Sequence, residues 1–190
     1  MQNTNEKFMN IFYAALLLIA FGLVSIQATA AGVDTDDFIE DAYAKGIAEI
    51  ESGKIALQKA THTEVHAYAK KMIEDHANSN KELRSLASKK NVEVPDDAEL
   101  VSQAKTYILK QRDGESFDAA YVNNQIESHK AAIELFKDAS SSKDEDVRQL
   151  AATSLPTLER HLAEAQALVP MLASTSDKIE EDDGKADYNH

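Results

Sequence analysis

The 190-residue sequence contains no cysteine and no tryptophan, and only six glycines and three prolines. The absence of cysteine excludes disulfides, thiol catalysis, cysteine-ligated zinc or iron–sulfur sites, and a lipid-modified cysteine anchor. Few glycines and prolines, together with 43% hydrophobic residues, are typical of a helical protein rather than a sheet protein. The length suffices for one domain with a hydrophobic core.

Basic residues are scarce as well. The chain has 20 Lys and Arg residues against 33 Asp and Glu residues, which gives a formal net charge of −13. Such an acidic surface repels phosphate backbones and anionic lipid, so we expect no nucleic-acid partner. The sequence also has no glycine-rich phosphate loop and no nucleophile elbow, and therefore gives little support for catalysis by those routes.

Residues 1–30 have the pattern of a secretory signal peptide. Lys7 precedes an apolar run over residues 11–24, and the Ala-Thr-Ala motif of residues 28–30 is a small-x-small cleavage pattern. The run is short for a membrane span and has no basic stop-transfer flank, although an uncleaved N-terminal anchor is an alternative. We predict an exported protein cleaved just before Ala31 and located in the periplasm or cell envelope, with no transmembrane span in the mature chain.

Hydrophobic periodicity predicts four long helices after the signal peptide. They cover about residues 38–60, 61–90, 116–140 and 144–172. Asp36 or Asp37 is expected to cap the first helix, and Thr61 with Glu64 forms a capping-box pattern at the start of the second. Pro156 predicts a kink or a local break in the fourth helix.

The connection between the second and third long helices is long enough to travel much of the length of a bundle. It contains a predicted short helix from about Asp97 to Lys110. Residues 173–190 are polar and acidic and are predicted to form a disordered tail. The prediction for residues 31–172 is thus an all-α, four-helix bundle with an extra short helix in this connection, monomeric or weakly associating.

Three of the predicted long helices each place one histidine on the stripe that faces the core. These histidines are His76, His129 and His161, and the first helix places Glu49 among small residues on one of its faces. All four residues lie near the midpoints of their helices. The midpoints of similar helices share one layer of a bundle whichever way each helix runs, so the sequence predicts a central layer of one carboxylate and three imidazoles.

This central layer has two interpretations. Three imidazoles and a carboxylate can hold zinc, copper or iron. Alternatively, the imidazoles and Glu49 can satisfy one another in a buried polar network that fixes helix register, and we favour this network because buried histidines are common. Asp75, Gln125 and Glu127 lie close enough along the chain to hydrogen-bond the members of the layer.

Four segments along the chain carry a family resemblance: AKGIAEIESGK (residues 44–54), MIEDH (72–76), FDAAY through the histidine at 129 (117–129) and LPTLERHL (155–162). In this order they resemble the domain-of-unknown-function 4142 family of exported bacterial proteins. Members of this family often carry an outer-membrane-protein label. The resemblance implies a ferritin-like helical bundle, with the long connection after the second helix as its crossover, and it implies no established activity.

The sequence departs from the pattern of ferritin-like di-iron oxidases. Their sites need a Glu-x-x-His pair on each of two helices, whereas Ile73, Ile126 and Leu158 stand three residues before the three histidines. We therefore interpret the chain as a non-enzymatic protein of the cell envelope, with a stress-related role as one option. The alternatives are a periplasmic metal-binding protein that uses the central layer, and a low-turnover redox enzyme at that metal.

Overall fold

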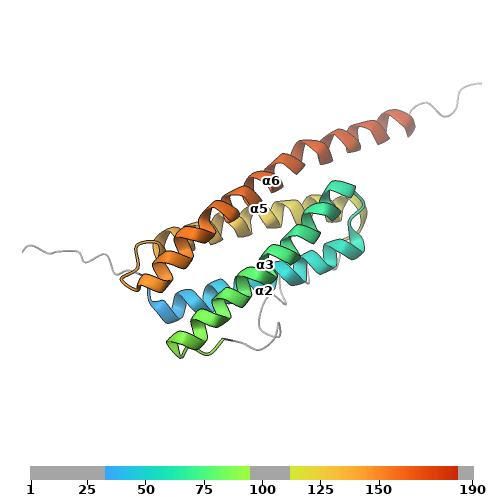
Figure 1. The fold of residues 1–190 in the computed structure, drawn as a ribbon. Coiled ribbons are helices and arrows are strands. Elements are labelled where there is room, and N and C mark those ends of the chain that lie inside the picture. The colour runs from blue at the N-terminus through green and yellow to red at the C-terminus, as the bar shows by residue number, and fades with distance from the viewer. Residues whose placement is uncertain (1–32, 95–111, 184–190) are drawn as a thin grey trace, which may run out of the picture. The chain divides into compact units, whose positions relative to one another are not determined.

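The computed structural model describes residues 33–94 and 112–183. Four helices pack as a bundle within the unit Gly32–His190 (Figure 1), and they are α2 (Thr35–Lys59), α3 (Thr63–Lys90), α5 (Gly114–Ala139) and α6 (Glu145–Asp183). The all-α class and the four long helices are therefore confirmed. The predicted signal peptide and the predicted short helix over about residues 97–110 lie outside the described residues and stay predictions.

The first helix begins earlier than predicted. Asp34, and not Asp36 or Asp37, is the N-cap of α2, because its Oδ1 accepts hydrogen bonds from the backbone N–H groups of Asp36 at 2.9 Å and Asp37 at 3.4 Å. The two predicted caps instead lie in the first turn, where their negative charges favour the positive end of the helix dipole.

The capping box predicted at Thr61 and Glu64 is wrong. Helix α3 begins at Thr63, and its N-cap residue makes no side-chain capping bond. The fully buried carboxylate of Asp118 on α5 takes over this role: it accepts from the Thr61 hydroxyl at 2.6 Å, the Thr61 N–H at 3.0 Å and the His62 N–H at 3.0 Å. A tertiary contact therefore replaces the local one.

Helix α6 runs without a break through Pro156 and Pro170 to Asp183. Proline at position 156 leaves the carbonyl of Ala152 without its amide donor, but Ala152 is exposed, so water can satisfy that carbonyl. The helix also continues beyond residue 172, where the sequence predicts its end. Residues 184–190 of the predicted tail lie outside the described residues.

Ion pairs at the helix ends define the direction of each helix. Lys90, at the end of α3, lies 2.5 Å from Asp144, just before α6. Lys59, at the end of α2, lies 2.9 Å from Asp113, just before α5. Because α2 leads directly into α3, α5 starts at the end of the bundle where α3 also starts. Helices α3 and α5 therefore run in one direction and α2 and α6 in the other, as a long crossover requires.

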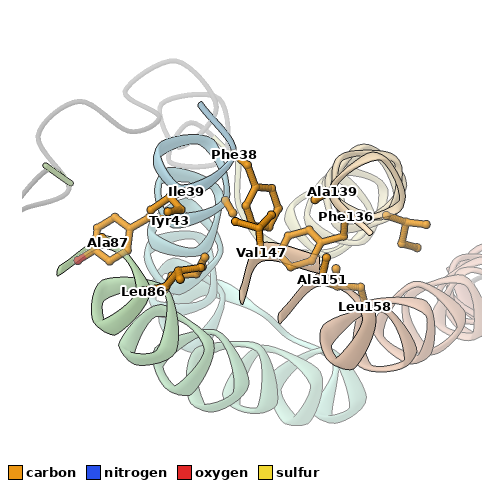
Figure 2. Packing of buried hydrophobic residues seen from close by; sticks show 13 residues of the cluster. Phe38, Ile39, Tyr43, Leu86, Ala87, Phe136, Ala139, Val147, Ala151 and Leu158 are labelled. Carbon is orange, nitrogen blue, oxygen red and sulfur yellow. The ribbon is translucent and has the colours of Figure 1, made fainter. Parts of the chain in front are cut away.

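Two clusters of buried apolar side chains fill the bundle. The first cluster joins the start of α2, the ends of α3 and α5 and the first half of α6 (Figure 2). It contains an edge-to-face contact between Phe38 and Phe136, whose ring centroids are 5.2 Å apart. The second joins the other ends of the helices around Tyr68 and Tyr121. On each helix the residue of the predicted central layer falls between the two clusters, so the layer separates two apolar cores.

Candidate metal centre

The structure brings the three predicted histidines together. One ring nitrogen of each of His76 on α3, His129 on α5 and His161 on α6 lies within 4.8 Å of those of the other two, and the ring centroids are 5.3–5.6 Å apart. Their exposed fractions are only 8%, 1% and 1%. Among the described residues, this is the group of histidine and acidic side chains whose geometry could hold a metal ion.

Glycines allow α2 to approach the histidine-bearing helix α3 closely. A Cβ on Gly53 would lie 2.8 Å from Cγ1 of Ile73 and 3.2 Å from the carbonyl oxygen of Ala69, so a larger residue would have to displace the Ile73 side chain and shift the helices slightly apart. A Cβ on Gly46 would lie 2.0 Å from Oδ1 of Asn80. The small residues that the sequence shows around Glu49 thus have a structural reason, which is close helix packing.

Two of the three rings are oriented by hydrogen bonds to their outer nitrogens. His129 Nδ1 lies 2.9 Å from the carbonyl oxygen of Gln125, which can only accept, so this nitrogen carries the proton. His161 Nε2 lies 2.8 Å from Oδ2 of Asp75, and the N–H of this ring donates a hydrogen bond to that carboxylate. Both partners were predicted as neighbours of the layer, whereas Glu127 is exposed and pairs with Lys130 at 2.9 Å.

The remaining buried ring nitrogens have no hydrogen-bond partner within the described part of the chain. They are Nε2 of His76, Nε2 of His129 and Nδ1 of His161. An imidazole nitrogen that is neither protonated nor hydrogen-bonded presents a lone pair. Nε2 of His129 and Nδ1 of His161 therefore each present a lone pair, because the other nitrogen of each ring carries the proton.

The surroundings keep two of these imidazoles, those of His76 and His161, uncharged. Burial lowers the pKa of His76 to about 3, and the neighbouring rings of His129 and His161 add to the effect. Burial also lowers the pKa of His161, although its hydrogen bond to Asp75 acts in the opposite direction. Neutral imidazole is the form that binds metal ions, so no proton has to leave these two rings at neutral pH before an ion binds.

Glu49 is buried, with 6% exposure, but it is not a member of the histidine group. Its Oε2 accepts a hydrogen bond of 2.5 Å from Nε2 of Gln125, the residue whose backbone carbonyl orients His129. Burial and the nearby Glu49 carboxylate raise the pKa of both Tyr68 and Tyr121, so these phenols stay protonated. Glu49 therefore belongs to a polar set beside the three rings.

Sequence reasoning missed two members of this polar set. The Tyr68 hydroxyl donates to the backbone carbonyl of His161 at 3.2 Å, and the Ser52 hydroxyl lies 3.4 Å from Nε2 of Gln125. Both residues share a helix face with a predicted member, Tyr68 with His76 and Ser52 with Glu49, so the helical period was the available signal.

A cavity of about 410 Å³ reaches the three histidines from the surface. All four helices line it, and its other members are mainly hydroxyl, amide and small side chains. Examples are Ser79 beside His76 and Thr157 one turn before His161. The cavity also touches the exposed residues Lys45 and Arg160, so it connects the buried rings with solvent.

The donor set fits a transition-metal ion. Zinc binds imidazole nitrogen at about 2.0–2.1 Å, which places ligand nitrogens about 3.3–3.5 Å apart in a tetrahedral site. The nitrogens here lie within 4.8 Å of one another, so side-chain movements that displace each nitrogen by about 1 Å bring them to one ion. The bonds to Gln125 and Asp75 match the usual arrangement in which a ligating histidine donates its other ring N–H to a carbonyl or carboxylate.

The chain belongs to the DUF4142 family, a domain of unknown function, which matches residues 24–168. Its fold is also similar to a crystal structure from Streptomyces coelicolor described as "putative secreted protein DUF305". The TM-score is 0.63 at 16% sequence identity, covering 72% of this chain and 90% of the other. No curated protein matches the chain in sequence. None of the described helices is long and apolar enough to cross a membrane.

Proposed function

We propose that this protein is an exported, periplasmic or envelope protein that binds one transition-metal ion through His76, His129 and His161. Two observations carry this proposal: each of the three imidazoles brings one ring nitrogen within 4.8 Å of the others, and each ring has one buried nitrogen without a hydrogen-bond partner in the described chain. Zinc, copper and iron are the ions that such nitrogen donors suit best.

The alternative, a purely structural polar network, requires the rings to satisfy one another. Pairwise hydrogen bonds would join a ring N–H to the lone pair of a neighbouring ring. The bonds that the rings make instead lead outward, to Gln125 from His129 and to Asp75 from His161. Leaving a buried acceptor unpaired costs about 1–3 kcal/mol, and an ion that takes the lone pairs of His129 and His161 removes this cost at both rings.

Export is supported by the sequence of the first 30 residues and by the fold similarity to a protein described as secreted. In an oxidising compartment a histidine site has an advantage over a cysteine site, because imidazole does not form disulfides. The chain has six histidines and no cysteine, which agrees with this chemistry. The chain has no Glu-x-x-His pair, the motif that di-iron oxidases use to hold two iron ions. We therefore propose a site for one ion held by histidines and not a di-iron oxidase site.

Metal analysis of the mature protein tests the proposal. The protein is purified from an exporting host without chelator and without an affinity tag that contains histidine. We expect about one equivalent of zinc, copper or iron per chain by elemental analysis, and its loss in His129→Leu. His66→Leu is the matched control, because His66 is exposed on α3, away from the cluster, and this variant should retain the metal.

A negative result is equally clear. If the purified protein holds no metal, and if Zn²⁺, Cu²⁺ and Fe²⁺ leave its melting temperature unchanged, the three histidines form a structural layer and the proposal is wrong. Circular dichroism of His129→Leu shows whether a loss of metal reflects the missing ligand or an unfolded chain.

A further inference from the structure

The histidine group offers three ligands, whereas zinc and cobalt in histidine sites commonly take four. Glu49 is the acidic residue that the sequence places in the same layer, but its carboxylate is held by Gln125 and lies outside the group of converging atoms. A protein site with three ligands and an open position is the arrangement of metal centres that bind a small exogenous molecule.

The cavity supplies a route and a space for such a molecule. Its volume of about 410 Å³ far exceeds the roughly 30 Å³ that one water molecule occupies in the liquid. The same cavity is lined by all three histidines and by residues exposed at the surface, such as Lys45 and Arg160. A small ligand can therefore reach the ion without any helix having to separate.

An ion at the cluster would attract an anion. Imidazole is an uncharged ligand, so a divalent ion bound by the three rings keeps its positive charge. Asp75 and Glu49 accept hydrogen bonds from His161 and Gln125, which leaves the fourth position of the ion to a ligand from the cavity. Hydroxyl groups of the lining, including those of Ser79, can donate hydrogen bonds to the outer end of an anion.

We propose that the metal ion held by the three histidines carries an exchangeable fourth ligand, a small anion that enters through this cavity. The inference rests on the proposed function, because it needs an ion at the cluster. It goes further in making the centre a binding site for a small molecule rather than a closed structural site.

Cobalt substitution separates the two proposals. Co²⁺ is added to the metal-free mature protein, and its visible absorption reports the number and type of ligands. We expect Co²⁺ to bind to the wild type and to fail to bind to His129→Leu. Sodium azide is then titrated into the cobalt protein, and we expect a saturable change in the cobalt bands. The change should not occur with Co²⁺ in buffer alone.

Two variants test the route and the ligand count. Ser79→Leu narrows the cavity one turn from His76, and we expect Co²⁺ binding to persist while azide affinity falls about tenfold. Ser85→Leu, exposed further along α3, is the matched control and should behave like the wild type. Glu49→Gln should keep the number of protein ligands that the cobalt spectrum reports before azide is added, because Glu49 is not a ligand in this proposal.

Each outcome decides between the proposals. Failure of Co²⁺ to bind the wild type overturns the metal-binding function itself. Binding of Co²⁺ without any response to about 100 mM azide, a concentration well above millimolar dissociation constants, overturns only the exchangeable ligand. A cobalt spectrum that shows one protein ligand fewer in Glu49→Gln makes Glu49 the fourth ligand and refutes the open position. Equal azide affinity in Ser79→Leu and Ser85→Leu refutes the route through the cavity.

Discussion

Acidification of the metal-free protein should destabilise it through the histidine cluster. In the unfolded chain His76 takes up a proton with the ordinary histidine pKa of about 6.5, whereas in the folded protein burial and the neighbouring rings lower the pKa to about 3. The unfolded state thus binds more protons than the folded state between these two values. Stability from this group is complete above pH 6.5 and is lost as the pH falls toward 3.

The size of the effect follows from the same pKa values. Each pH unit below 6.5 costs about 1.36 kcal/mol for one such group, so His76 alone should lower the free energy of unfolding by about 2 kcal/mol between pH 7 and pH 5. For a domain of this length that is a decrease of roughly 4–8 °C in melting temperature. The lowered pKa of His161 acts in the same direction.

Urea denaturation of the metal-free protein at pH 7 and pH 5, with a chelator present, measures this loss. His76→Leu removes the group, so the stability of the variant should fall by about 2 kcal/mol less over the same interval. His66→Leu removes an exposed imidazole of the same helix and should retain the wild-type pH dependence. Equal losses in the wild type and His76→Leu would show that His76 does not lose a proton on folding and would refute the reasoning.

Three further substitutions test the supporting contacts. Asp75→Asn should weaken zinc binding about 10–100-fold in a competition titration, because the orienting carboxylate is lost, and unchanged affinity would exclude this role. Gly46→Ala should destabilise the protein by about 1 kcal/mol in urea denaturation, since its Cβ would lie 2.0 Å from Oδ1 of Asn80, but should stabilise it in an Asn80→Ala background. Asp118→Ala should cost about 1–2 kcal/mol because the start of α3 loses its capping carboxylate, and a loss below about 0.5 kcal/mol would contradict that.

The approach of the helices explains why Gly46 and Asn80 are coupled. Asn80 is buried and its Nδ2 donates to the carbonyl of Tyr43 at 3.2 Å, so its side chain is not free to move away from a new methyl group. Helix propensity alone favours alanine over glycine by about 1 kcal/mol. Whether Gly46→Ala raises or lowers the free energy of unfolding therefore depends on the side chain at position 80. The measurement thus reports how closely α2 and α3 pack at this point.

Local sequence alone determined the helices and the layer of histidines. Hydrophobic residues repeat at the helical period, and this period fixes which face of each helix turns inward without knowledge of the partner helices. His76, His129 and His161 lie on those faces near the helix midpoints, and the midpoints coincide in any bundle of similar helices. The cluster was therefore predictable because it depends only on periodicity and length.

Features that depend on the other helices were not predictable in the same way. Asp118 replaces the capping box because α5 begins beside the turn between α2 and α3, more than 50 residues from Thr61 in sequence. Glu49 accepts a hydrogen bond from the amide of Gln125, a residue 76 positions away on α5. Such contacts arise from the packing angle and depth of the helices, which periodicity does not specify.

The tertiary structure also decided the protonation pattern of the site. The sequence shows three imidazoles in one layer but not which nitrogen of each ring faces inward. The carbonyl of Gln125 and the carboxylate of Asp75 each take one ring N–H and so turn a lone pair of His129 and His161 toward the interior. A polar network and a metal centre share the same residues, and the direction of these hydrogen bonds agrees with the arrangement usual for metal ligands.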